Sequence, residues 1–244
     1  MHIIRLIHLA LPAPLATAAS SISTEVREHW MRRAIAALTE LVSPCPSQAF
    51  GAAVVNHTGS NNGYGDLICI GANSILFTGD PTLHGEIAAM RNCTSIFTDP
   101  NGPYKFDRPG AIAAFRDLTM YTTGEPCPMC ATAMRRAAFK ECVFATSVPT
   151  LVDLGWAQSE IRTKEVYDRS TALGRETVLL EGVLANETDP LFAWQFDDSH
   201  PCPAGCGRDK GSGTRVTLEN GYEELYKEGL GGLSASGKRT NVAT

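Results

Sequence analysis

Residues 125–130 read Glu-Pro-Cys-Pro-Met-Cys and place two cysteines, Cys127 and Cys130, three positions apart. The pattern around them predicts a helix over residues 127–138, so both cysteines belong to its first turn. Residues three apart on a helix lie on one face, and the positive end of the helix dipole favours thiolates. The two sulfur atoms are therefore expected side by side, in the charge state that a metal ion requires.

His84 and Glu86 belong to a second short motif, His-Gly-Glu, in a helix predicted over residues 80–92. Residues two apart do not share a helix face, so His84 must lie at the very start of its helix if both side chains reach one cavity. One imidazole and two thiolates leave the fourth position of a zinc ion open, which is typical of catalytic zinc. Zinc makes hydroxide available near neutral pH, and Glu86 can pass a proton from the water to a leaving nitrogen.

The cysteine pair also admits two structural interpretations, a closed zinc knuckle and a disulfide between Cys127 and Cys130. Neither of them requires a glutamate two positions after the histidine. Neither of them accounts for the missing fourth ligand. The two motifs together therefore favour a catalytic site.

The combination of motifs resembles the zinc nucleobase deaminases of the cytidine deaminase-like superfamily. The resemblance covers roughly residues 24–196 and is closest to the branch of guanine deaminases and tRNA adenosine deaminases. Residues 80–86, Asp-Pro-Thr-Leu-His-Gly-Glu, are similar to the Asp-Pro-Thr-Ala-His-Ala-Glu of that branch. Residues 122–130, Thr-Thr-Gly-Glu-Pro-Cys-Pro-Met-Cys, are also near its form.

The resemblance implies that zinc is held by His84, Cys127 and Cys130 and that Glu86 is the catalytic proton shuttle. The implied reaction is hydrolytic deamination with release of ammonia. The expected substrate is a free purine base or nucleoside, with guanine as the first choice, and a homodimer is expected. A tRNA adenosine deaminase is the alternative enzyme, and an inactive zinc-stabilised binding protein is the alternative of another class.

Three further residues, Asn73, Trp156 and Trp194, are expected to contact the substrate because the resemblance places them in substrate-binding segments. Without the resemblance, Asn73 would be interpreted as a turn residue at a strand end, and the two tryptophans could equally belong to the core. The guanine deaminases carry acidic residues after their Gly-aromatic pair. Here those positions are Ala157 and Gln158, which weakens the case for guanine specifically.

Nucleic acid is not an expected partner. Arg135, Arg136 and Lys140 follow the cysteine helix, where a tRNA enzyme would bind phosphates. Three cations are few, and a solvated helix face is the favoured interpretation. The net charge of −5 also opposes a wide surface for nucleic acid.

Alternating strands and helices predict an α/β domain, and the resemblance implies a three-layer α/β/α sandwich with a mixed five-stranded sheet. An irregular insertion is expected over residues 94–117, which contain Asp-Pro-Asn-Gly-Pro. The predicted helices cover residues 24–42, 80–92, 127–138 and 159–170, and the predicted strands cover 50–56, 67–73, 118–122, 142–145 and 178–184.

The 244 residues are 43% hydrophobic and 19% charged, which is a globular composition. The sequence lacks the long apolar run that spans a membrane. Residues 1–20 resemble a marginal signal peptide or a disordered tail, so the protein is expected to be secreted or otherwise cytoplasmic. The deaminase domain is expected over residues 21–196, followed by a Cys- and Gly-rich extension over 197–244 that is partly disordered.

Six of the eight cysteines lie outside the metal motif, and an even number permits disulfides. Cys69 and Cys142 lie in apolar strand-like runs and are expected to be buried thiols. Cys45 and the two cysteines of the C-terminal extension, Cys202 and Cys206, lie among prolines and glycines, where bridges are more common. With His200, these three could instead form a second zinc site.

Overall fold

The computed structural model of the chain describes residues 22–58, 63–208 and 216–218. Its central element is a five-stranded mixed sheet with the strand order β2-β1-β3-β4-β5. β1 pairs antiparallel with β2 and β3, whereas β4 runs parallel to both β3 and β5. This arrangement confirms the predicted fold class. The strands are β1 (Gly51–Asn56), β2 (Asp66–Ala72), β3 (Leu118–Gly124), β4 (Glu141–Thr146) and β5 (Val178–Leu180).

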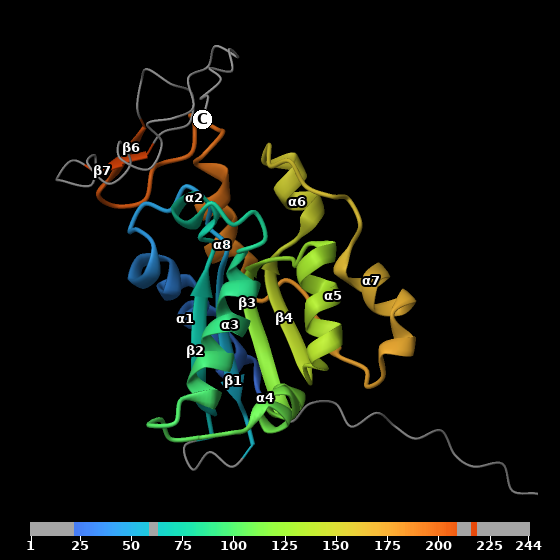
Figure 1. Cartoon of the computed structure of the whole chain (residues 1–244). Helices are drawn as coiled ribbons and strands as arrows, with labels where there is room; N and C mark the ends of the chain where they lie inside the picture. Colours follow the sequence, from blue (N-terminus) through green and yellow to red (C-terminus); the bar gives the residue numbers. More distant parts are fainter. Residues whose placement is uncertain (1–21, 59–62, 209–215, 219–244) are drawn as a thin grey trace, which may run out of the picture.

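Helices cover both faces of this sheet and give the molecule three layers (Figure 1). β1 explains why both faces need a cover, because Ala52 and Val54 belong to the core beneath α3 and α5, while Ala53 and Val55 belong to the core beneath α1. Successive side chains of a strand point to opposite faces, so a continuous apolar strand is buried on both. The helices are α1 (Thr24–Leu41), α2 (Ile75–Thr78), α3 (Gly85–Thr98), α4 (Arg108–Ala114), α5 (Pro128–Ala137), α6 (Val148–Asp153), α7 (Thr163–Arg169) and α8 (Ala185–Ala193).

The helix predicted over residues 80–92 begins later than expected. The side chain of Asp80 accepts hydrogen bonds from the amide and the hydroxyl of Thr82, which holds the preceding residues in a turn. α3 then starts at Gly85, and His84 is its N-cap residue with an extended backbone, φ −65° and ψ 163°. The histidine therefore lies at the very start of the helix, as the spacing of His84 and Glu86 demanded.

The prediction of an irregular insertion over residues 94–117 is wrong for much of this segment. α3 continues to Thr98, and α4 forms farther along the same segment. The side chain of Asp107 caps α4 by accepting a hydrogen bond of 2.8 Å from the amide of Gly110. α6 and α8 also lie where no helix was predicted. In α8, the sequence gives a reason for this, because a proline such as Pro190 is unfavourable inside a helix.

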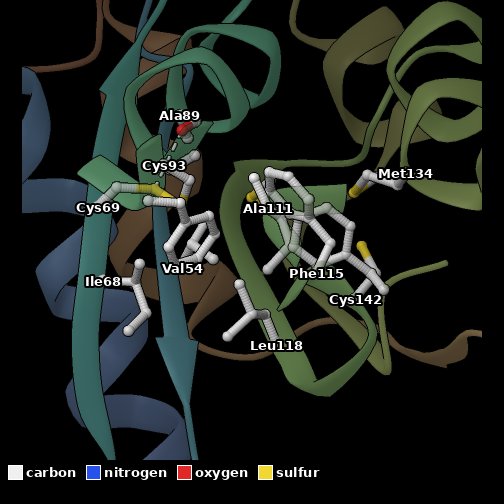
Figure 2. Close-up of a cluster of buried hydrophobic side chains, with 14 of the residues drawn as sticks. Val54, Ile68, Cys69, Ala89, Cys93, Ala111, Phe115, Leu118, Met134 and Cys142 are labelled. Carbon is white, nitrogen blue, oxygen red and sulfur yellow. Dashed lines mark hydrogen bonds between the residues drawn. A yellow bond between two sulfur atoms is a disulfide. The ribbon is translucent and has the colours of Figure 1, made fainter. Parts of the chain in front are cut away.

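α3 packs unusually close to the sheet at Gly71 of β2. A Cβ atom built on Gly71 would lie 2.2 Å from the amide nitrogen of Ala89 and 2.4 Å from the carbonyl oxygen of Gly85. Beside this contact, a disulfide joins Cys69 of β2 to Cys93 of α3 (Figure 2). The prediction that Cys69 is a free thiol is therefore wrong, because the docking of α3 on β2 brings together two cysteines that are 24 positions apart.

A second disulfide ties the start of the C-terminal extension back to the domain. Cys45, in the loop after α1, is bonded to Cys206 in the short strand β6 (Cys206–Arg208), 161 positions later. Gln195 donates a hydrogen bond to the carbonyl of Pro46 in the same loop. β6 pairs antiparallel with β7 (Val216–Leu218).

The alternative of a second zinc site is wrong, since the Cys45–Cys206 bridge uses two of its four candidate ligands. A third candidate, His200, pairs through Nδ1 with a carboxylate oxygen of Asp197 at 2.9 Å. The remaining one, Cys202, is a free thiol. The prediction for Cys142 is confirmed, as this cysteine is buried and unbridged.

The expected signal peptide or tail over residues 1–20 lies outside the described residues, as does most of the extension after residue 208. Within the described ranges, no helix combines the length and the apolar character needed to cross a bilayer.

The disulfides predict a definite thiol count. The zinc-free protein unfolded in guanidinium should titrate four thiols, because Cys127, Cys130, Cys142 and Cys202 are unbridged. All eight cysteines should react after reduction. Non-reducing peptide mapping should recover the two bridges, and a Cys127–Cys130 crosslink in freshly purified protein would contradict this assignment.

Gly71→Ala should destabilise the protein because the added methyl group has no room between β2 and α3. Overpacking of this kind costs about 1–3 kcal/mol of unfolding free energy. Urea unfolding followed by circular dichroism would measure the change. An unchanged midpoint would mean that α3 does not pack on β2 at this distance.

Candidate active site

Two helix starts meet beside the ends of β2 and β3. α3 begins after His84 and α5 begins after Cys127, and both residues are N-caps with nearly the same extended backbone. Neither side chain caps its own helix, so both are left for another role. The Nδ1 atom of His84 lies 3.6 Å from the Sγ atom of Cys127. The positive ends of two helix dipoles therefore converge on this point, where they favour negatively charged groups.

One ligand atom each from His84, Cys127 and Cys130 lies within 4.8 Å of the other two. A hydrogen bond from the Cys130 thiol lowers the pKa of Cys127 to about 4. The same hydrogen bond, together with burial and the charge of Glu86, raises the pKa of Cys130. A divalent cation between the two sulfur atoms would favour the thiolate form of both. The donor set of one imidazole and two thiols therefore fits zinc.

Glu86 lies in the first turn of α3 and is only 3% exposed. Burial, followed by the charge of Cys127, raises the pKa of its carboxyl group to about 7. A carboxyl group with a pKa near neutrality can both accept and donate a proton at physiological pH. Glu86 therefore has the protonation behaviour of a general acid and base.

A cavity of about 290 Å³ opens beside these groups. His84, Glu86 and Cys127 line it, so two of the three metal-binding donors and the buried carboxylate face the same space. No lysine or arginine is among the described residues that line it. The other lining residues are Gln48, Phe50, Asn73, Ile75, Glu125, Trp156, Ala157, Gln158 and Ser159.

The structure brings Asn73 and Trp156, but not Trp194, to this cavity. The side-chain oxygen of Asn73 accepts a hydrogen bond of 3.2 Å from the amide of Ile75. The indole of Trp156 donates to the carbonyl of Phe192 at 3.1 Å, and its ring has edge contacts with the surrounding phenylalanines. Trp194 is 1% exposed at the end of α8 and belongs to the protein core. Its predicted approach to the substrate is not found in this chain.

Several cavity residues were missed in the sequence. Gln48 and Phe50 come from the loop after α1, which carries no motif, and only the fold brings them to the same cavity as His84. Glu125 lies inside the Glu-Pro-Cys motif, but its role was not visible. It is buried beside the cavity and accepts hydrogen bonds from α6 and α7.

Of the three basic residues after the cysteines, Arg135 is buried and is used inside the protein. The side chain of Arg135 is 1% exposed, and its guanidinium group donates to Ser170, to the carbonyl of Arg175 and to Thr177. It therefore holds α5 against the segment after α7, and it is not part of a solvated helix face.

Comparisons with known proteins agree with this site. Residues 24–146 match the model of the cytidine and deoxycytidylate deaminase zinc-binding region. The chain is 28% identical over 168 residues to the guanine deaminase of Bacillus subtilis (strain 168), a match that covers 69% of this chain and 93% of that protein. Two crystal structures of mutants of NE0047 in complex with 8-azaguanine share the fold. Their TM-scores are 0.52 and 0.50, at 19% and 20% identity, covering 78% of this chain and 95% and 96% of theirs.

Proposed function

The chain belongs to the cytidine and deoxycytidylate deaminase family, since the match to its zinc-binding region covers half of the sequence, and on this premise we propose that it deaminates a free purine base or nucleoside, guanine first. As a member of this family, it is a zinc-dependent hydrolytic deaminase. The reaction replaces an amino group of the base by oxygen from water and releases ammonia. The observation that carries the proposal is the small cavity lined by His84, Cys127 and the buried Glu86.

His84, Cys127 and Cys130 are the proposed zinc ligands. When bound, zinc lowers the pKa of water enough to supply hydroxide near neutral pH. The three donors come from the starts of two helices, so the metal position is tied to the backbone of both. Their charge, two thiolates and a neutral imidazole, balances that of the ion.

Glu86 is the proposed proton carrier. It accepts one proton from the attacking water and delivers it to the leaving nitrogen, so that ammonia departs as a neutral molecule. A binding protein without activity would have no need to bury this carboxyl group. Its burial therefore favours an enzyme over a zinc-stabilised scaffold.

The cavity supports a small and uncharged substrate. Its volume of about 290 Å³ is near the lower end of ligand cavities. A nucleotide would bring a phosphate group, which proteins usually neutralise with lysine or arginine, and the described lining residues include neither. The guanine deaminase of Bacillus subtilis, a relative, and the 8-azaguanine bound to the NE0047 mutants support a purine base.

Asn73 and Trp156 are the proposed orienting residues for the base. Asn73 offers an amide group for hydrogen bonds, and Trp156 offers an indole ring for contact with the plane of the base. Ala157 and Gln158 take the place of the acidic residues expected in guanine deaminases, so that any hydrogen bond at this position comes from a neutral amide. Trp194 is not included, because it is buried in the core.

Compartment and assembly remain predictions. The two disulfides support passage through an oxidising compartment, which agrees with the expected signal peptide. The homodimer is still an expectation of the family resemblance.

Glu86→Gln tests the mechanism. We expect deamination to fall by about 100-fold or more, because the amide cannot accept the proton, while the zinc content stays unchanged. Ammonia release would be measured with guanine, guanosine, adenine, adenosine, cytosine, cytidine and a tRNA anticodon stem. Glu160→Gln, at an exposed position, is the matched control and should keep full activity.

If the wild-type protein released ammonia from the tRNA stem but from no small molecule, the proposed substrate would be wrong. If Glu86→Gln kept its activity, the assignment of the proton carrier would be wrong.

His84→Ala and Cys127→Ser should each lose bound zinc and lower the melting temperature, since structural energy from the metal is lost with its ligand. Metal analysis by mass spectrometry and thermal unfolding would measure both effects. Cys202→Ser, a change at a free cysteine outside the cavity, is the control. One zinc ion per chain in either ligand variant would refute the ligand set.

A further inference from the structure

Glu125 is a buried carboxylate with four hydrogen bonds and one ion-pair partner. Its side chain is 1% exposed, and the Nε atom of Arg162 lies 2.8 and 2.7 Å from its two oxygen atoms. The backbone amides of Val148 and Thr163 donate to the same carboxylate at 2.8 and 2.9 Å. A buried charge is tolerated when it is paired and its hydrogen-bonding capacity is filled, and both conditions hold here.

The two amides belong to the first residues of α6 and α7. The loop between these helices carries residues 156–159, which line the cavity and are called the wall below. Both helices that flank the wall therefore begin at the same carboxylate. The hydroxyl of Thr163 also donates to the carbonyl of Pro126 at 2.8 Å, next to Cys127.

Arg162 lies at the end of the loop that carries the wall, and its side chain pairs with the carboxylate of Glu125. Its Nη2 atom also lies 3.3 Å from an oxygen of Glu181, just after β5. The Arg162 side chain is 31% exposed, and its guanidinium group pairs with the buried carboxylate. Without it, the buried carboxylate of Glu125 would retain two amide donors and no cationic partner.

We propose that Arg162 is a positioning residue that fixes the wall against the turn before Cys127 and thereby sets the affinity for the substrate. The inference rests on the proposed function, in which the wall contacts the base. Arg162 touches neither substrate nor metal and acts through Glu125. In enzymes generally, a misplacement of about 1 Å can cost about 100-fold in activity, so a displaced wall should have a measurable effect.

The test uses Arg162→Gln, Arg162→Lys and the control Lys164→Gln in the full-length, zinc-loaded protein. Lys164 lies two positions along the chain and forms an exposed pair with Asp168, so its replacement removes the same charge without touching Glu125. Steady-state kinetics would be measured on the base that the wild type deaminates. Zinc content and hydrogen exchange at the amides of Val148 and Thr163 would be measured alongside.

Arg162→Gln should raise KM by about tenfold or more with a smaller change in kcat, speed exchange at both amides and retain one zinc ion per chain. Arg162→Lys should lie between this variant and the wild type, because lysine restores the charge without the planar fork. Lys164→Gln should match the wild type. Unchanged exchange and KM in Arg162→Gln would overturn the proposal, and so would loss of zinc together with kcat.

The two proposals fail in different ways. A wild-type protein that deaminates none of the tested bases would refute the proposed function. Hydrogen exchange at the two amides would still decide whether Arg162 holds the wall.

Discussion

Two thiol groups and a carboxyl group lie close together, and the repulsion between their ionised forms is the constraint around which the site is built. Cys127, Cys130 and Glu86 could not all ionise there without a positive charge. The structure supplies part of that charge through the starts of α3 and α5, and the zinc of the family supplies the rest. The backbone of both helices must therefore be held in place within a fraction of an ångström.

The close packing of α3 on β2 meets this requirement for His84 and Glu86. Gly71 has no side chain, so the helix backbone can touch the strand, and the Cys69–Cys93 bridge joins the same two elements. The last residues of β3 do the same for Cys127, because they lead directly into α5. The metal-binding donors are thus carried by elements that the sheet fixes, whereas the substrate would be contacted by loops.

Those loops are held by a second set of interactions. Glu125 anchors the starts of α6 and α7, and the aromatic cluster of Phe50, Trp156 and Phe192 supports the wall from the core side. The Cys45–Cys206 bridge ties the loop that leads to Phe50 to the C-terminal extension. The sheet thus positions the metal-binding donors and Glu86, and loops held by cross-links form the walls of the cavity. Functional loops on a rigid scaffold are common in proteins.

The sequence by itself determined those features that depend on residues close together in the chain. The spacing of Cys127 and Cys130, the histidine two positions before Glu86, and the periodic apolar segments depend on contacts within one turn or strand, so a local pattern is enough to read them. Only the tertiary structure decided which distant residues meet. The pairing of Cys69 with Cys93, the burial of Trp194 and of Arg135, the position of Gln48 at the cavity and the pairing of Arg162 with Glu125 all follow from how remote segments pack together. Such packing is a balance of many weak contacts between remote segments, and no local pattern records it.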